Sequence, residues 1–269
     1  MNSKSMDSRI ALRKTKHVVI KIGSSILMKK SGAFSVPFFR SLAKQIASLM
    51  ERNLLVTLVS SGAIAGGMHR LNVKKRPHLI PEKQALAACG QTALMHTYEK
   101  VFGRFGIHVA QILLTRGDLE EKRRYLNARQ AIFELLRLKV LPIINENDTV
   151  AVDEIQVGDN DNLSALVTNL IEADLLILLT NINGVYTADP KLKQNAKLLR
   201  VIADIDEAVH RFASDTKTAT SIGGMITKLQ AAEMTSHFGI PTVIAKGSKK
   251  NIILDILNGK ECGTLVLAK

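Results

Sequence analysis

The sequence predicts an α/β fold, namely a three-layer α/β/α sandwich around a mainly parallel central sheet. Short β-branched runs alternate along the chain with longer amphipathic runs, the order typical of a parallel sheet covered by helices. Most of the short runs are apolar at every position, as expected of strands with a helix layer on each face. The 269 residues, of which 46% are hydrophobic, suffice for a large buried core.

Six segments have the length and composition of strands. They are HVVIKI (17–22), LLVTLVS (54–60), HVAQILLT (108–115), VLPIIN (140–145), ADLLILLT (173–180) and IPTVIAKG (240–247).

Three long segments repeat apolar residues at three-and-four spacing and are predicted helices: 36–53, 83–106 and 118–138. Two more helices are expected over 162–174 and 227–239. Alternation in TVAVDEIQV (149–157) predicts a small hairpin, and GVYTADP (184–190) a surface excursion that ends at Pro190. Residues 1–16 are polar and basic, so we expect a mobile extension before one domain over 17–269, organised in two lobes.

Composition excludes several classes of protein. Two distant cysteines, Cys89 and Cys262, form neither a disulfide framework nor a zinc motif, which favours a cytoplasmic location. No secretory signal is present, and the apolar runs are too short for a membrane span. The net charge of +13 fits an anionic ligand or nucleic acid. A basic nucleic-acid-binding regulator is the rival from another class, but the charges are dispersed and no nucleic-acid motif occurs.

Two glycine-rich segments follow predicted strands, where ligands bind in open α/β sheets, and a third comes later in the chain. These are KIGSS (21–25), SSGAIAGG (60–67) and TSIGGMITK (220–228), the last opening a helix. Glycine lets backbone N–H groups approach a ligand, and a helix N-terminus attracts anions. Three such segments at one sheet edge predict a phosphorylated ligand.

Two lysines within these segments stand in unusual places. Lys21 ends an otherwise apolar strand, where a charge is costly without a partner. Lys228 lies in the first turn of a helix, although the helix dipole favours cations at the other end. Each alone is more readily a solvated lysine. Together with the glycine-rich segments they predict a clamp around a polyphosphate.

Acidic and amide residues concentrate in VGDNDNLSALV (157–167). Asp159 is placed to cap the following helix, but one cap needs only one such residue. The surplus, with Asp148 before the expected hairpin, suggests donors and acceptors for a zwitterionic ligand. Ser61, in the turn after the second strand, is expected to supply a hydroxyl group and a backbone N–H.

Several kinase and hydrolase motifs are absent, including GxxxxGK[ST], GxGxxG after the first strand, HRD, DFG, GxSxG and HExxH. A kinase that phosphorylates a carboxylate accounts for these absences. A carboxyl group with a pKa of about 4.3 is already ionised at pH 7 and needs no general base. Phosphoryl transfer then depends on positioning and charge neutralisation.

Seven motifs carry a resemblance to the amino acid kinase family over residues 17–267. They are VVIKIGSS, VSSGAIAGG, QILLTRGD, YLNAR, INENDTVAVDEIQVGDNDNLSALV, GVYTADP and GGMITKLQAA. The segment 144–166 resembles the branch that phosphorylates the γ-carboxylate of free L-glutamate with ATP. That reaction gives L-glutamyl 5-phosphate in the first step of proline biosynthesis. Another branch, acetylglutamate kinase or uridylate kinase, is the nearest alternative.

The resemblance implies a role for each matching residue. It implies Lys21 and Lys228 as lysines that stabilise the transferred phosphoryl group, with Asp161 orienting both. It implies glutamate binding by Ser61, Asp148 and Asn160. It implies ATP binding by the following residues: Lys21, Thr180, Asn181, Ile222, Gly223, Gly224, Met225, Ile226, Thr227 and Lys228.

The resemblance also implies Mg²⁺ held mainly by ATP, with no protein metal ligand, and feedback inhibition by proline. A homodimer or homotetramer is expected, with glutamyl-phosphate reductase as a functional partner and neither membrane nor nucleic acid. The family commonly has Asp where this chain has Asn181 and Thr where it has Ile222, both on the nucleotide side. Many members of this branch carry a C-terminal PUA domain, which we do not expect in a chain that ends at Lys269.

Overall fold

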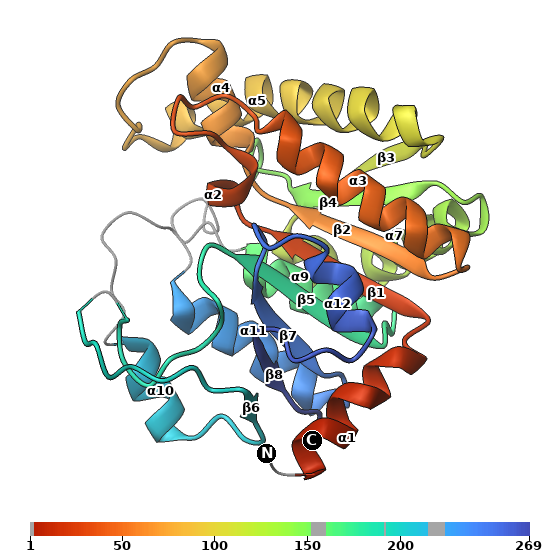
Figure 1. Ribbon diagram of the computed structural model, residues 1–269. Coiled ribbons are helices and arrows are strands. Elements are labelled where there is room, and N and C mark those ends of the chain that lie inside the picture. The colour runs from red at the N-terminus through yellow and green to blue at the C-terminus, as the bar shows by residue number, and fades with distance from the viewer. Residues whose placement is uncertain (1–2, 152–159, 191, 215–223) are drawn as a thin grey trace. The chain divides into compact units, whose positions relative to one another are not determined.

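The computed structural model describes residues 3–151, 160–190, 192–214 and 224–269. The chain divides into two compact units, each with strands flanked by helices (Figure 1). Unit 1 comprises residues 1–21 and 161–269, and unit 2 comprises residues 22–160. The boundaries therefore fall between Lys21 and Ile22 and between Asn160 and Asp161.

Unit 2 contains three parallel strands in the order β3-β4-β2. The strands are β2 (Leu55–Ser60), β3 (Val109–Leu114) and β4 (Leu141–Glu146). Their helices are α2 (Ser24–Leu27), α3 (Val36–Glu51), α4 (Ala63–Arg70), α5 (Ile80–Phe102), the 3-10 helix Gly103–Phe105, α6 (Arg116–Glu120) and α7 (Lys122–Arg137).

The sequence predicts one helix over 118–138, whereas the structure has two, α6 and α7. A capping box starts α6, since Thr115 Oγ1 accepts from the Asp118 N–H at 3.2 Å and the Asp118 carboxylate accepts from the Thr115 N–H at 2.8 Å. Glu121 then leaves the helical region at φ −86° and ψ 119°. Its carboxylate caps α7 by accepting from the N–H groups of Arg123 and Arg124.

Two glycines bring α4 and α5 into close contact. A Cβ atom at Gly67 would lie 1.9 Å from the Leu86 carbonyl oxygen, and one at Gly90 would lie 1.7 Å from that of Ala63. Only glycine permits this backbone approach. The contact therefore fixes α5 against α4, and with it the backbone position of the next residue, Gln91.

Unit 1 contains strands in the order β1-β5-β7-β8-β6. β5 and β7 are parallel, as are β6 and β8, whereas β7 and β8 are antiparallel. The strands are β1 (His17–Ile22, its last residue in unit 2), β5 (Leu175–Thr180), β6 (Val201–Ile202), β7 (Thr242–Lys246) and β8 (Thr264–Val266). The helices are α1 (Ser3–Ala11), the 3-10 helix Leu12–Lys14, α9 (Asn160–Leu170, its first residue in unit 2), α10 (Glu207–Ser214), α11 (Met225–His237) and α12 (Ile252–Leu257).

Three strands, β1, β4 and β5, are buried at every position, so both of their faces are covered. The predicted three-layer, mainly parallel α/β fold is confirmed. All six predicted strands are present, with ends shifted by at most two residues. β6 and β8 were missed because two or three residues show no periodicity. No helix in the described ranges has the length and apolarity to cross a bilayer.

The segment 184–190 is not a surface excursion, and that prediction was wrong. Val185 is fully buried, and its N–H donates to Thr264 Oγ1 at 2.9 Å. Tyr186 forms an isolated antiparallel bridge with Leu198. The glycine and the polar residues of this segment are typical of a surface loop. In the structure they belong to an irregular segment that packs within unit 1.

The first residues form a helix where the sequence suggests a mobile extension. Arg9 of α1 is 3% exposed, and its guanidinium donates to the carbonyl oxygens of Arg200, Cys262 and Gly263. Leu12 is also buried. Most of the hairpin predicted over 149–157, and the cap predicted at Asp159, lie outside the described residues.

Candidate active site

A charged cluster in unit 1 consists of Lys21, Asp161, Thr227 and Lys228. Asp161 is completely buried in the first turn of α9. The Lys21 ammonium donates to its Oδ1 at 2.6 Å, and the Lys228 ammonium donates to its Oδ2 at 3.0 Å. Thr227 Oγ1 donates to the same Oδ2 at 2.8 Å. The two lysines that the sequence singled out therefore share one carboxylate.

The electrostatics of this lysine–aspartate cluster favour an ionised Asp161. Burial alone would raise the pKa of Asp161, because a carboxylate loses hydration in the interior. The nearby ammonium groups of Lys21 and Lys228, and their hydrogen bonds, outweigh burial and hold that pKa well below its ordinary value. Asp161 is therefore a fixed negative charge at any physiological pH.

The N-terminus of α11 adjoins the same cluster. Gly224 is its N-cap, and no side chain caps the helix there. A Cβ atom at Gly224 would meet nothing within 4 Å, so packing does not require glycine at this position. Among the described residues nothing caps these N–H groups or fills the space beside Gly224, and such a helix start suits an anionic ligand.

Several of the predicted nucleotide-binding residues lie on two segments of unit 1. Thr180 is the last residue of β5 and is buried, while Asn181 follows it and is exposed. Their side chains are joined by a 3.3 Å hydrogen bond from Thr180 Oγ1 to Asn181 Oδ1. Residues 224–228 form the start of α11, with Met225 buried and Ile226 partly exposed. Ile222 and Gly223 lie outside the described residues.

A chain of three buried side-chain amides, which we call the amide relay, crosses unit 2. It consists of Asn160, Asn145 and Gln91. Asn160 Nδ2 donates to Asn145 Oδ1 at 2.8 Å, and Asn145 Nδ2 donates to Gln91 Oε1 at 2.9 Å. Asn160 Nδ2 also lies 3.0 Å from the Ser60 carbonyl oxygen and 2.9 Å from Ser61 Oγ. The relay thus links α9, the end of β4, the end of β2 and α5.

Ser61 contributes less than the sequence suggests. Its hydroxyl lies at the Asn160 end of the relay, as expected for a ligand-binding serine. Its backbone N–H, however, donates to the Ile22 carbonyl oxygen at 3.1 Å. The prediction that this N–H is available to a ligand was therefore wrong. The following residue, Gly62, has φ +106°, a conformation that favours glycine and turns the chain into α4.

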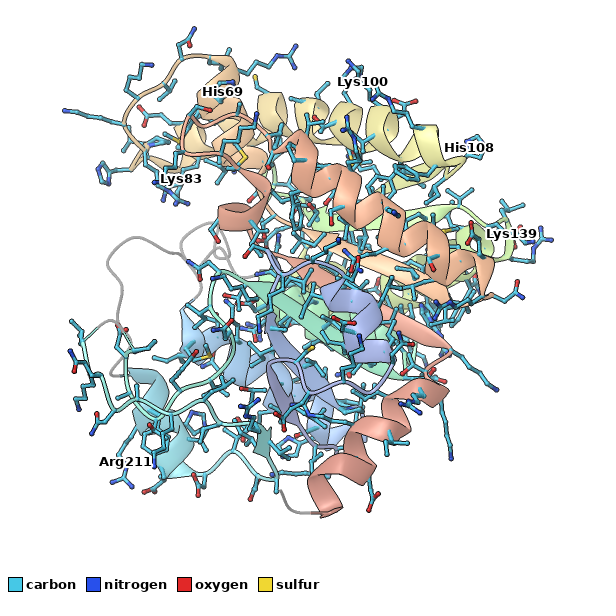
Figure 2. The ribbon with its side chains drawn as sticks, viewed as in Figure 1. His69, Lys83, Lys100, His108, Lys139 and Arg211 are labelled. Atoms are coloured by element: carbon cyan, nitrogen blue, oxygen red, sulfur yellow. The ribbon has the colours of Figure 1, made fainter. Side chains whose placement is uncertain are left out.

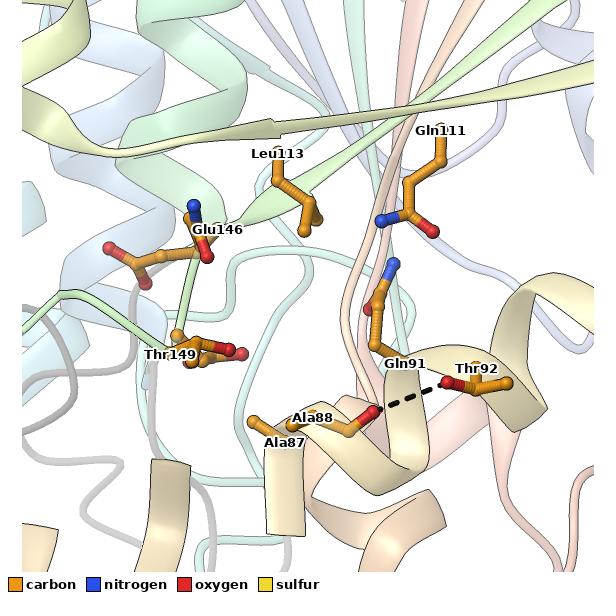
Figure 3. A pocket seen from close by; sticks show the side chains of 10 residues that line it. Ala87, Ala88, Gln91, Thr92, Gln111, Leu113, Glu146 and Thr149 are labelled. Carbon is orange, nitrogen blue, oxygen red and sulfur yellow. Dashed lines mark hydrogen bonds between the residues drawn. The ribbon is translucent and has the colours of Figure 1, made fainter. Parts of the chain in front are cut away.

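A cavity of about 230 Å³ lies beside the relay in unit 2 (Figure 3). Asp148 lines it, and burial raises the pKa of this carboxyl group to about 6. The ionised form of Asp148 is thus costly without a cationic partner. The full lining is Ala87, Ala88, Gln91, Thr92, Gln111, Leu113, Glu146, Asn147, Asp148 and Thr149.

The structure brings together Lys21, Asp161 and Lys228 in unit 1 and Ser61 and Asn160 in unit 2, and places Asp148 on the cavity wall. Sequence reasoning missed Asn145 and Gln91. Asn145 had a detectable signal, since it is a polar residue near the end of an apolar strand. Gln91 had none, because a glutamine in an amphipathic helix is ordinarily solvated.

The described residues contain no group of three or more His, Cys, Asp or Glu side chains placed to hold a metal. Asp161 is also engaged on both oxygens by lysine and threonine donors.

These features are those of a phosphotransferase that works without a P-loop. They are a mainly parallel sheet, two lysines held on one buried aspartate, and a helix N-terminus without a side-chain cap among the described residues. The chain belongs to the amino acid kinase family, which it matches over residues 16–246. It is 49% identical over 256 residues to glutamate 5-kinase of Geobacter metallireducens, covering 95% of this chain and 69% of the relative. It is 46% identical over 263 residues to glutamate 5-kinase of Moorella thermoacetica, covering 98% and 70%.

Solved structures share the fold at low sequence identity. UMP kinase from Bacillus anthracis superposes with a TM-score of 0.64 at 16% identity, covering 95% of this chain and 97% of that one. Isopentenyl phosphate kinase superposes with a TM-score of 0.64, also at 16% identity, covering 93% and 99%. The shared fold thus serves phosphate acceptors of different chemistry, and the acceptor must be argued from the site.

Proposed function

We propose that the protein transfers the γ-phosphoryl group of ATP to the γ-carboxylate of L-glutamate, giving L-glutamyl 5-phosphate and ADP. The observation that carries the proposal is the pair of neighbours Asn160 and Asp161. Asn160 belongs to a neutral amide relay beside a polar cavity, and Asp161 holds two ammonium groups. Relatives named glutamate 5-kinase, 45–49% identical, support the same reaction.

Lys21 and Lys228 stabilise the negative charge of the transferred phosphoryl group. Each ammonium is held on one oxygen of Asp161, so its position is set before the substrate arrives. The attacking γ-carboxylate is ionised at neutral pH and requires no general base. Transfer then depends on positioning and charge stabilisation alone.

ATP is held, on this proposal, by Thr180, Asn181 and the start of α11, together with Ile222 and Gly223. The uncapped N–H groups after Gly224 suit a phosphate oxygen. Mg²⁺ arriving with the nucleotide would supply charge neutralisation on its phosphate groups. No residue of this chain is assigned to it.

Glutamate is held by Asp148, Asn160 and Ser61. Asp148 suits the α-ammonium group, because a partly buried carboxylate with a raised pKa gains a cationic partner when the substrate binds. An N-acetylated glutamate has no ammonium, and a uridine nucleotide has none either. Asp148 therefore separates this acceptor from those of the alternative branches.

The proposal is tested by ATP turnover measured with L-glutamate, N-acetyl-L-glutamate, L-aspartate and UMP in parallel. We expect fast turnover with glutamate only. N-acetylglutamate or UMP as the best acceptor would replace the proposed substrate with that of another branch. No turnover with any of the four would refute the assignment to this reaction.

We also propose feedback inhibition by proline, a homodimer or homotetramer, and delivery of the labile product to glutamyl-phosphate reductase in the cytoplasm. The support is the resemblance to the family. Proline added to the glutamate assay, and light scattering of the purified protein, test the first two points. Coupled turnover with the reductase tests the third.

A further inference from the structure

The direction of every hydrogen bond in the amide relay is fixed by one backbone carbonyl. The Ser60 carbonyl oxygen can only accept, so the atom of Asn160 that faces it must be the amide nitrogen. The same nitrogen donates to Asn145, which therefore presents its oxygen there and its nitrogen to Gln91. Gln91 must then accept through Oε1, and its Nε2 is left pointing away from the relay.

Gln91 Nε2 is a buried donor without a partner. Gln91 is only 9% exposed, and its Nε2 has no hydrogen-bond partner among the described residues. In Figure 3 this nitrogen points toward the side chain of Gln111, another residue of the cavity wall. An unsatisfied buried donor is costly, and such groups in native proteins usually have a ligand or water.

We propose that Gln91 binds the α-carboxylate of the amino-acid substrate through Nε2. The inference rests on the proposed function and adds a specificity-determining residue to it. An amide N–H₂ offers two donors, which suit a carboxylate, whereas the Asp148 carboxylate on the same cavity wall repels one and suits an ammonium group. Gln91 and Asp148 thus offer this cavity one group for each charge of a zwitterion, while Glu146 adds a second carboxylate to its wall.

The shared cavity indicates which carboxylate Gln91 binds. Gln91 and Asp148 line the same cavity of unit 2. In an amino acid the ammonium group and the α-carboxylate are bonded to the same carbon atom. The carboxylate that accompanies an ammonium group at Asp148 is therefore the α-carboxylate. The close approach of α4 and α5 at Gly90 keeps the neighbouring Gln91 in place.

Two substitutions distinguish direct binding from support of the relay. Gln91→Glu keeps an oxygen acceptor for Asn145 but replaces the Nε2 donor with a second oxygen. Gln91→Leu removes both. We expect each to raise the KM for glutamate by about 10- to 100-fold, with the KM for ATP within about twofold of wild type. If Gln91 only supported the relay, Gln91→Glu would resemble wild type.

The matched control is Gln45→Leu. Gln45 is a buried glutamine of α3 in the same unit, and its Nε2 already donates to the Ser41 carbonyl oxygen at 3.2 Å. This substitution should leave both KM values unchanged. Far-UV circular dichroism reports folding for every variant, and glutamate-induced protection from thermal unfolding reports binding without turnover. We expect that protection to be lost in both Gln91 variants.

A substrate analogue completes the test. Glutamate whose α-carboxylate is converted to a carboxamide should be a poor substrate for the wild type. In Gln91→Glu the new carboxylate can accept from that carboxamide, so the preference for glutamate over the amide should fall by about tenfold or more. An unchanged preference, or a wild-type KM in Gln91→Glu, would overturn the role of Gln91. Glutamate turnover by the wild type would still stand, so the two proposals fail separately.

Discussion

Asn160 and Asp161 are consecutive residues, yet their surroundings differ completely. Asp161 is a buried charge held by two ammonium groups, whereas Asn160 starts a chain of neutral amides. A second carboxyl group, that of the partly exposed Asp148, sharpens the contrast, because no ammonium group of the described residues pairs with it as Lys21 and Lys228 pair with Asp161. Its pKa is raised to about 6, while that of Asp161 is held below its ordinary value.

The contrast indicates a division of labour. A cluster of permanent charges suits the stabilisation of a transferred phosphoryl group, because its ammonium groups are held in position before the substrate binds. The Gln91 Nε2 donor and the Asp148 carboxylate suit recognition of a zwitterion, because each gains a partner of matching chemistry when it binds. The basic side chains labelled in Figure 2 lie on separate elements of both units, including α4, α5 and α10. The net charge of +13 therefore does not locate the candidate site, which is identified by its local contacts.

The largest effect is expected for Lys228→Ala. Loss of the ammonium group removes charge stabilisation from the transferred phosphoryl group, so kcat should fall by about 10²- to 10³-fold while glutamate still binds. Steady-state kinetics with glutamate protection from thermal unfolding measure the two effects. Lys100→Ala, at an exposed position of α5, is the control and should retain wild-type kcat. A kcat within threefold of wild type would remove Lys228 from the chemistry.

Asp161→Asn should destabilise the fold as well as slow the reaction. The substitution leaves Lys21 and Lys228 buried without the carboxylate, a loss expected to cost about 3–5 kcal/mol in the free energy of unfolding. Urea denaturation at pH 7 measures it. Asp204→Asn, which removes an exposed pair with Lys269, should have no measurable effect. An unchanged urea midpoint for Asp161→Asn would contradict the electrostatic account.

Asp148→Asn should have the opposite effect on stability. A carboxyl group whose folded pKa is raised destabilises the folded state once pH exceeds that pKa, so its removal should leave the ligand-free protein at least as stable at pH 8. The KM for glutamate should rise by about 100-fold, because the α-ammonium loses its anionic partner, with the KM for ATP unchanged. Equal effects on both KM values would exclude the assigned contact.

The pH dependence of glutamate binding gives a smaller effect. Asp148 must be ionised to bind the ammonium group, so kcat/KM for glutamate should fall as pH drops through about 6. At pH 5 the decrease should be about tenfold relative to pH 8, following the ionised fraction. Asp148→Asn should abolish this particular dependence. The same profile in the variant would assign the titration to another group.

The sequence predicted the fold well because apolar strands and amphipathic helices have clear periods. It singled out Lys21 and Lys228 because a charge in an apolar strand or in the first turn of a helix needs a physical reason, and the resemblance implied Asp161 as their partner. The structure places both ammonium groups on that carboxylate, and their roles in the reaction stay predictions. It did not predict Gln91 or Asn145, since only the tertiary structure shows that their amides form a directed chain. Its prediction for the Ser61 N–H was wrong, because that group donates to the Ile22 carbonyl oxygen. It also predicted one helix where the structure has two, because the Glu121 side chain caps a new helix, α7.

The most direct test of the division of labour compares Asn160→Ala with Asp161→Ala in the same assay. Asn160→Ala should raise the KM for glutamate by about tenfold or more, with the KM for ATP within about threefold of wild type. Asp161→Ala should lower kcat by at least about 100-fold. If both neighbours instead gave the same kinetic signature, the separation of substrate recognition from phosphoryl stabilisation would be wrong.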